Sequence, residues 1–175
     1  MKKVLKGIMT VLVATWPIKG NLSAENLPPA NLNVSATATQ VGNGYEYDYR
    51  FKNTGDKTLI QFNILTPEQR AAAGQMPIIK ECWVPAGWTG QVTTMGNQTT
   101  MVVWVSSGNP GSDLAPGAEL SGFGFISDAS SGKANFTARD SSMAEYQGDT
   151  TGPAVGAGTG ATDGTAKGNV LCQTR

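Results

Sequence analysis

The sequence contains no histidine, and this absence narrows the chemistry that its side chains could perform. Histidine is the commonest general base, it activates serine and cysteine nucleophiles, and it supplies ligands to most catalytic zinc ions. Two cysteines alone provide too few ligands for a metal ion. Carboxylate chemistry is what remains, so we expect no metal, no cofactor and no histidine-dependent enzyme.

Carboxylates occur in two places where they could act together. In residues 46–52, Glu46 and Asp48 share the polar face of a strand with Arg50 and Lys52, a pattern typical of a face in contact with solvent. Two carboxylates facing each other at about 5 to 10 Å could instead hydrolyse a glycoside, which keeps a secreted hydrolase as a minor alternative. The acidic residues between 140 and 149 are spaced too loosely for a calcium-binding loop. We therefore predict no catalytic centre.

Tryptophans are the remaining candidates for ligand binding, because a flat ring that faces solvent can stack on a sugar ring or anchor a protein partner. Trp88 follows the break at Pro85-Ala86-Gly87, so we expect it in a loop that can expose its ring. Trp83 and Trp104 fall within expected strands, where a tryptophan is more often part of the core. We name Trp88, with Trp83 and Trp104 as weaker candidates, as tentative ligand-binding residues.

The first residues of the chain are typical of a secretory signal peptide. Lys2, Lys3 and Lys6 precede an apolar run from Ile8 to Ile18, which is too short to span a bilayer. We expect cleavage after Ala24, with a retained membrane anchor as the alternative. The chain would then be secreted, either extracellular or periplasmic, with no membrane attachment after cleavage.

The charge that remains after cleavage argues against a nucleic-acid partner. Nine basic and thirteen acidic residues follow residue 24, which leaves a net charge of −4. A nucleic-acid-binding domain needs a basic face to neutralise phosphates. We therefore expect no nucleic-acid partner.

The two cysteines that follow the leader, Cys82 and Cys172, are predicted to form a disulfide bond, because an even number of cysteines in an exported chain favours pairing. Two unpaired thiols are the alternative. A disulfide bond would fix the position of a C-terminal segment that has few apolar residues of its own.

Alternation of apolar and polar residues predicts β-strands through most of the chain. The pattern is clearest at residues 45–52, where Tyr45, Tyr47 and Tyr49 point one way and charged residues point the other, and we interpret the tyrosine row as an inner sheet face. Gly122 and Gly124 suggest a bulge or a close backbone approach. Further strands are expected at residues 32–38, 60–64, 78–84, 90–95, 98–105, 120–127, 134–139 and 170–172.

One short connecting helix is expected from Thr66 to Gly74, with Thr66 as N-cap, Pro67 at the first helical position and Gln69 completing a capping box. Many short strands without a long helix predict an all-β fold, an antiparallel immunoglobulin-like β-sandwich. The domains expected are a signal peptide (residues 1–24), the sandwich (25–147) and a Gly/Thr-rich C-terminal segment (148–175). This last segment is expected to be a linker unless the disulfide bond tethers it to the sandwich.

Two parts of the sequence resemble secreted bacterial β-sandwich modules, including carbohydrate-binding modules that bind cellulose. One part contains Val103-Trp104-Val105, Leu114-Ala115-Pro116-Gly117 and Ser121-Gly122-Phe123-Gly124-Phe125, and the other is Tyr49-Arg50-Phe51-Lys52-Asn53-Thr54-Gly55. The position of Cys82 in mid-domain departs from those modules. The resemblance implies a secreted sandwich.

We expect a secreted, non-catalytic binding or adhesion module whose partner is a polysaccharide or a surface protein. The leading hypothesis is a glycan that stacks on the ring of Trp88. The alternative is a structural subunit of an extracellular fibre, surface layer or matrix that associates with copies of itself through a sheet edge or its C-terminal segment.

Overall fold

The structure, a computed structural model, describes residues 28–65, 79–94, 100–153 and 170–175. All regular elements in these ranges are β-strands. The signal peptide expected at residues 1–24 and the helix expected at Thr66–Gly74 lie outside the described residues. Within the described ranges, no helix has the length and apolarity needed to cross a lipid bilayer.

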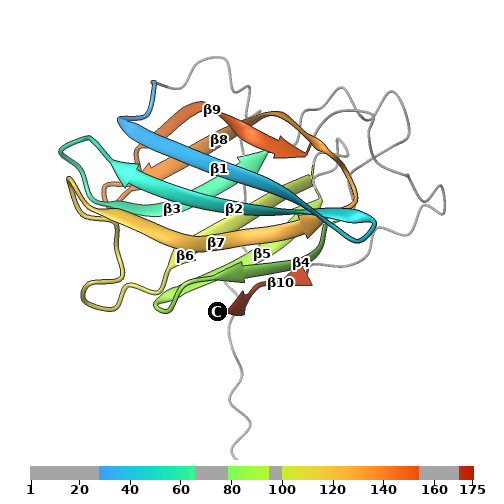
Figure 1. Ribbon diagram of the computed structural model, residues 1–175. Coiled ribbons are helices and arrows are strands. Elements are labelled where there is room, and N and C mark those ends of the chain that lie inside the picture. Colours follow the sequence, from blue (N-terminus) through green and yellow to red (C-terminus); the bar gives the residue numbers. More distant parts are fainter. Residues whose placement is uncertain (1–27, 66–78, 95–99, 154–169) are drawn as a thin grey trace, which may run out of the picture.

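The strands form two sheets that face each other (Figure 1), which confirms the predicted antiparallel, immunoglobulin-like β-sandwich. All strand pairs are antiparallel except β4 and β11. The five-stranded sheet contains, in spatial order, β1 (Leu32–Val41), β2 (Gly44–Asn53), β7 (Glu119–Ser127), β4 (Ile79–Val84) and β11 (Gln173–Thr174). The six-stranded sheet contains β10 (Val170–Leu171), β5 (Trp88–Thr94), β6 (Thr100–Ser106), β3 (Leu59–Leu65), β8 (Ser131–Asp140) and β9 (Glu145–Pro153).

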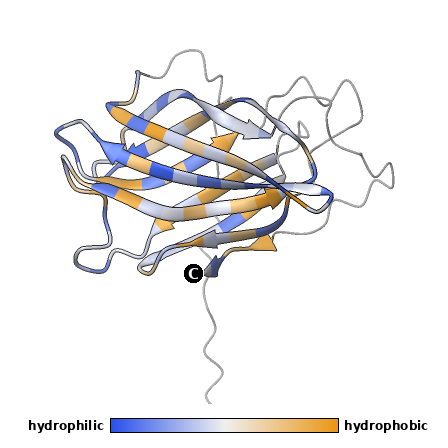
Figure 2. Cartoon of the chain, in the orientation of Figure 1, coloured by the Kyte–Doolittle hydropathy of each residue, from blue (hydrophilic) through white to orange (hydrophobic). Residues whose placement is uncertain are grey.

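Strand β2 shows how the alternating sequence places the core. Tyr47, Tyr49 and Phe51 are buried between the sheets, whereas the residues between them face outward. Because successive side chains of a strand point to opposite faces, this register follows directly from the period of two. The interpretation of the tyrosine row as an inner face is confirmed, and the alternation is visible along the ribbons in Figure 2.

The buried tyrosine hydroxyls each reach a backbone acceptor. Tyr47 Oη donates to the carbonyl of Ala129 at 2.8 Å, and Tyr49 Oη donates to that of Thr151 at 3.0 Å. A buried hydroxyl without a partner would cost about 1 to 3 kcal/mol. These bonds therefore allow the aromatic core to include tyrosines.

The turn after β2 is built around the buried side chain of Asn53. Its Nδ2 donates to the carbonyls of Lys57 at 2.7 Å and Leu114 at 3.0 Å, and its Oδ1 accepts from the backbone of Gly55 at 3.0 Å. This amide ties the β2–β3 turn to the long loop before β7. The Asn-Thr-Gly corner thus joins two loops at one end of the sandwich.

The glycines in β7 have the roles expected of them. The β2–β7 ladder is interrupted between Tyr49 and Arg50, and Gly122 on the facing strand has a φ of +92°, which a glycine adopts without strain. The predicted bulge is confirmed.

The sandwich extends beyond the boundary expected at residue 147, because residues 148–153 belong to β9 and pair with β8 along their whole length. A Cβ atom at Gly148 would lie 2.5 Å from the ring of Phe136, and one at Gly152 would lie 2.6 Å from Cβ of Ala134. Glycine at these positions therefore permits close packing, and interpreting it here as part of a linker was wrong. Residues 154–169 lie outside the described part of the chain.

The C-terminal clasp, residues 170–175, joins the two sheets at the side where β4 and β5 form their edges. Val170 and Leu171 pair with β5, and Gln173 and Thr174 pair with β4. Between them lies Cys172, whose disulfide bond with Cys82 confirms the predicted pairing. In Figure 1 this segment lies beside β4.

Candidate functional site

Trp88 and Trp104 lie inside the sandwich, with 3% and 0% of their surface exposed. Trp88 opens β5 directly after the three-residue break, and its ring stacks on Phe62 at a centroid distance of 5.2 Å. Its indole nitrogen donates to the carbonyl of Ser112 at 2.8 Å. The expectation that Trp88 is exposed in a loop was wrong, because the break is too short to carry the residue away from the sheet. Neither ring presents a face to a ligand.

Trp83 is separated from the other two tryptophans. It belongs to no part of the core cluster between the sheets, and it lies in register with Gly124 of β7. Only 3% of it is exposed, and the guanidinium of Arg175 lies 3.9 Å from its ring centroid. The structure therefore does not gather the three tentative ligand-binding residues into one site.

The acidic residues singled out between positions 140 and 149 are also held apart, each by its own partners. Asp140 accepts hydrogen bonds from the backbone of Ser142 and Ala144, Glu145 pairs with Arg139, and Asp149 pairs with Lys133. No group of three metal-ligating side chains occurs within the described ranges. These acidic side chains stabilise local turns and strand pairs through the bonds just described.

The outer face of the six-stranded sheet carries an apolar column along β6. Met101, Val103 and Val105 are half-buried and belong to no part of the core, whereas Val102 and Trp104 between them point inward. Within the described ranges, the outward side chains of this column pack against no part of the core. We call this surface, centred on the column, the six-strand face.

Polar side chains flank the column on β3 and β8. Gln61 Nε2 donates to Asn63 Oδ1 at 3.0 Å, and Asn63 Nδ2 donates to Thr137 Oγ1 at 2.8 Å. Asn63 and Thr137 are in register with Val103. This chain of hydrogen bonds holds the amides in fixed orientations beside the apolar column.

The edges of the six-strand face are neutral or apolar. Arg139 and Glu145 pair at 3.3 Å, and Lys133 and Asp149 pair at 2.9 Å, so these charges compensate one another. At the opposite edge Leu171 is 72% exposed and pairs with outward-facing Gln91. An apolar centre with a polar surround is the anatomy of a protein interface.

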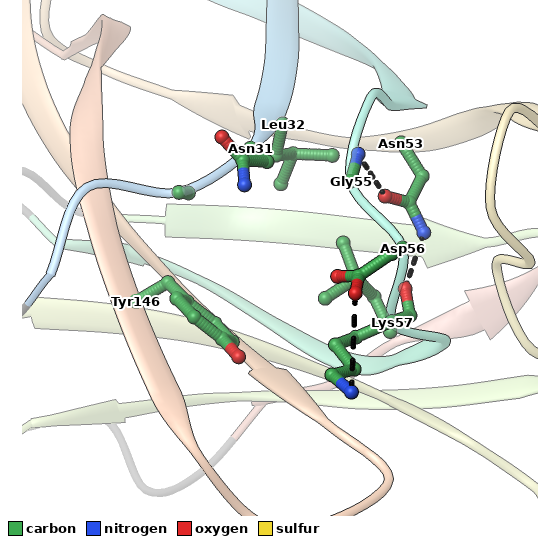
Figure 3. A pocket seen from close by; sticks show the side chains of 9 residues that line it. Asn31, Leu32, Asn53, Gly55, Asp56, Lys57 and Tyr146 are labelled. Atoms are coloured by element: carbon green, nitrogen blue, oxygen red, sulfur yellow. Dashed lines mark hydrogen bonds and ion pairs between the residues drawn. The ribbon is translucent and has the colours of Figure 1, made fainter.

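A second candidate is a small pocket that opens to solvent at one end of the sandwich. Figure 3 shows Tyr146 on one side of it, with Asp56 and Lys57 of the β2–β3 turn on the other. Tyr146 Oη donates to Asp140 Oδ2 at 2.8 Å, and this bond raises the pKa of the tyrosine. The ring is thereby fixed in orientation, half-exposed, with polar groups around it.

Sequence reasoning missed both surfaces. The signal for the six-strand face was present, because residues 101–105 are apolar without interruption. An unbroken apolar run in a strand indicates that both faces are apolar. The pocket had no local signal, since residues 56 and 146 meet only through the fold.

Comparison with solved structures finds other β-sandwich proteins. A protein from Nocardia farcinica, whose structure is described as revealing an immunoglobulin-like fold, is 16% identical, with a TM-score of 0.48, covering 70% of this chain and 97% of that one. Chains of two type I cohesin–dockerin complexes from Clostridium thermocellum are 8% and 11% identical, with TM-scores of 0.41 and 0.35. They cover 71% and 67% of this chain, and 94% and 97% of their own.

No protein-family model and no curated protein sequence matches the chain. The strand pairing described above therefore defines the class of protein. It is an all-β sandwich in which the C-terminal clasp pairs with both sheets.

Proposed function

We propose that this chain is an exported, non-catalytic binding module that attaches to a protein surface through the six-strand face. The observation that carries the proposal is the column of Met101, Val103 and Val105, which faces away from the core and packs against nothing within it. Burying outward apolar surface is favourable by about 25 cal/mol per Å². A partner protein with a matching apolar patch supplies that burial.

The composition of the face favours a protein over a glycan. Sugar rings stack on aromatic rings, whereas the column is aliphatic and the tryptophans Trp88 and Trp104 are buried. The amide of Gln61, fixed by its hydrogen bond to Asn63, offers a polar group to a partner backbone. The compensated charges at the edge favour a partner patch without strong charge.

The test compares the protein with a variant that carries a charge at the centre of the face. Val103→Lys should abolish retention of proteins from a cell-surface fraction on the immobilised module, because burying the lysine is costly. Asn33→Lys, exposed on β1 of the other sheet, is the matched control and should retain the same proteins. Equal retention by both variants would refute the assignment of this face.

A second copy of the chain is the partner that would make the protein a structural subunit. Closed symmetric pairing of one face with itself is the commonest arrangement in homo-oligomers. Light scattering across a concentration series distinguishes the two cases. A dimer that Val103→Lys dissociates and Asn33→Lys does not would assign the face to self-assembly and contradict the heterologous partner.

Export is supported by the basic and apolar N-terminus and by the Cys82–Cys172 bond, since disulfides persist in oxidising compartments. Mass spectrometry of the protein from fractionated cells tests this part. A mature chain that begins at Glu25 and lies outside the cytoplasm is expected. A full-length cytoplasmic chain with two free thiols would contradict it.

For a glycan, the pocket beside Tyr146 is the better candidate site, because it offers a half-exposed ring between polar side chains. Tyr146→Ala should abolish binding on a glycan array, whereas Tyr146→Phe keeps the ring and should retain most of it. Binding that is equal in all three proteins would exclude the pocket.

A further inference from the structure

The C-terminal clasp places a guanidinium group on the outer face of the five-stranded sheet. Arg175 Nη1 lies 3.1 Å from Glu46 Oε1, and its guanidinium carbon lies 3.9 Å from the ring centroid of Trp83. The backbone N–H of Arg175 donates to the carbonyl of Val84 at 3.0 Å. The arginine is thus held by a ring face, a carboxylate and the backbone of β4.

The indole can lie flat on the sheet because the residue beneath it is glycine. Trp83, Gly124 and Asp48 are neighbours in one row across β4, β7 and β2. A Cβ atom at Gly124 would lie 2.5 Å from the Trp83 ring. Any side chain at this position would lift the indole and displace the seat of the guanidinium.

The second carboxylate of the site lies beside the indole. Hydrogen bonding from the Trp83 side chain, whose only polar group is the N–H donor, lowers the pKa of Asp48. Glu46 stands two residues before Asp48 on the same face of β2. The site therefore combines one aromatic face with two carboxylates, which is the chemistry that recognises a guanidinium.

The two carboxylates lie close enough to influence each other. The pKa of Asp48 is raised by burial first and by the charge of Glu46 second, whereas the charge of Arg175 and hydrogen bonding from the Trp83 side chain lower it. Arg175 therefore acts electrostatically on Asp48 as well as pairing with Glu46.

We propose that Trp83, Glu46 and Asp48 form a recognition site for a guanidinium group, that Arg175 is its resident ligand, and that an arginine in an extended peptide of a partner protein can take the same place. The site lies on the opposite sheet from the six-strand face and does not depend on the function proposed for that face. Residues 173–175 lie beyond Cys172, so they can leave β4 without any change to the Cys82–Cys172 bond. The vacated edge of β4 then accepts another extended segment, as it accepts β11.

The resident arginine competes with any external one, because it is tethered beside the site at an effective concentration of millimolar order. The test is therefore made on Arg175→Ala, with Trp83 observed through its indole N–H signal in NMR spectra. The probes are the peptides acetyl-Gln-Thr-Arg and acetyl-Gln-Thr-citrulline, which differ in charge and not in shape. The indole signals of Trp88 and Trp104 report whether the core stays folded.

Arg175→Ala should move the Trp83 signal, and the arginine peptide at millimolar concentration should move it back toward its position in the unmodified protein. The citrulline peptide should bind about tenfold more weakly. The unmodified protein should need more arginine peptide than Arg175→Ala does, since its own Arg175 competes.

Two further variants, each combined with Arg175→Ala, sharpen the result. Glu46→Gln should weaken binding of the arginine peptide, whereas Arg50→Ala, on the same face of β2 but paired with Glu119, should leave it unchanged. With the Trp88 and Trp104 signals in place, an arginine peptide that does not shift Trp83, or that binds no better than the citrulline peptide, would overturn the proposal.

Discussion

The rings of Phe51 and Phe62 stack face to face across the interior of the sandwich, with centroids 4.1 Å apart and planes inclined by 5°. Phe51 belongs to β2 in one sheet and Phe62 to β3 in the other. The ring of Phe123 meets both of them edge-on, at 5.2 and 5.9 Å. The contact between the two sheets is therefore concentrated in an aromatic cluster rather than spread over aliphatic side chains.

Replacement of Phe62 by alanine should cost about 3 to 5 kcal/mol of unfolding free energy, because the cavity left between two sheets cannot collapse fully. Urea unfolding followed by tryptophan fluorescence measures the change. Thr37→Ala, exposed on β1, is the control and should stay within about 0.5 kcal/mol. A loss at Phe62 of less than about 1 kcal/mol would show that the stack is not central to the sheet contact.

Gly124→Ala should destabilise the protein by about 1 to 3 kcal/mol, since the added methyl group would meet both the Trp83 ring and the carbonyl of Tyr47. The same change should move the Trp83 indole N–H signal and leave that of Trp104 in place. Ser121→Ala, an exposed position on the same strand, is the matched control. A stable Gly124→Ala variant with an unmoved Trp83 signal would show that the indole is not seated on this glycine.

Loss of the Cys82–Cys172 bond should lower stability by about 4 to 5 kcal/mol in the chain-entropy model, because the two residues are separated by 90 positions. The double variant Cys82→Ser, Cys172→Ser avoids free thiols. Thermal unfolding and amide exchange check two linked outcomes, a lower melting temperature and faster exchange at Cys172 and Arg175. Unchanged protection at these amides would mean that strand pairing alone holds the clasp.

Much of the fold was predictable because its strands are amphipathic. In β2 the alternation of tyrosines with charged residues determines which face is buried, and no knowledge of distant segments is needed. The bulge at Gly122 was predictable for a different reason, since a local backbone requirement selects glycine at that position.

The errors arose where a residue's environment depends on distant parts of the chain. Trp88 follows a loop-like tripeptide, yet its burial depends on Phe62 of another strand. Gly148 begins a segment whose composition is typical of a linker, but glycine is required there because the ring of Phe136 on β8 packs against it. The seat of Arg175 on Trp83 requires the disulfide and the register of β11, which no local pattern encodes.

Acidification should destabilise the protein in part through Asp140. The pKa of this buried carboxyl is lowered, first by the hydroxyl of Ser142 and further by Tyr146 and the Ala144 backbone. A lowered pKa in the folded state means that the unfolded chain binds the proton more tightly. The stabilisation is therefore complete above the ordinary aspartate pKa and is lost as the pH falls through the lower value in the folded protein. Unfolding free energies measured from about pH 6 to pH 2 should fall less steeply for Asp140→Asn than for the unmodified protein. Identical slopes would show that this carboxylate contributes nothing to the acid sensitivity.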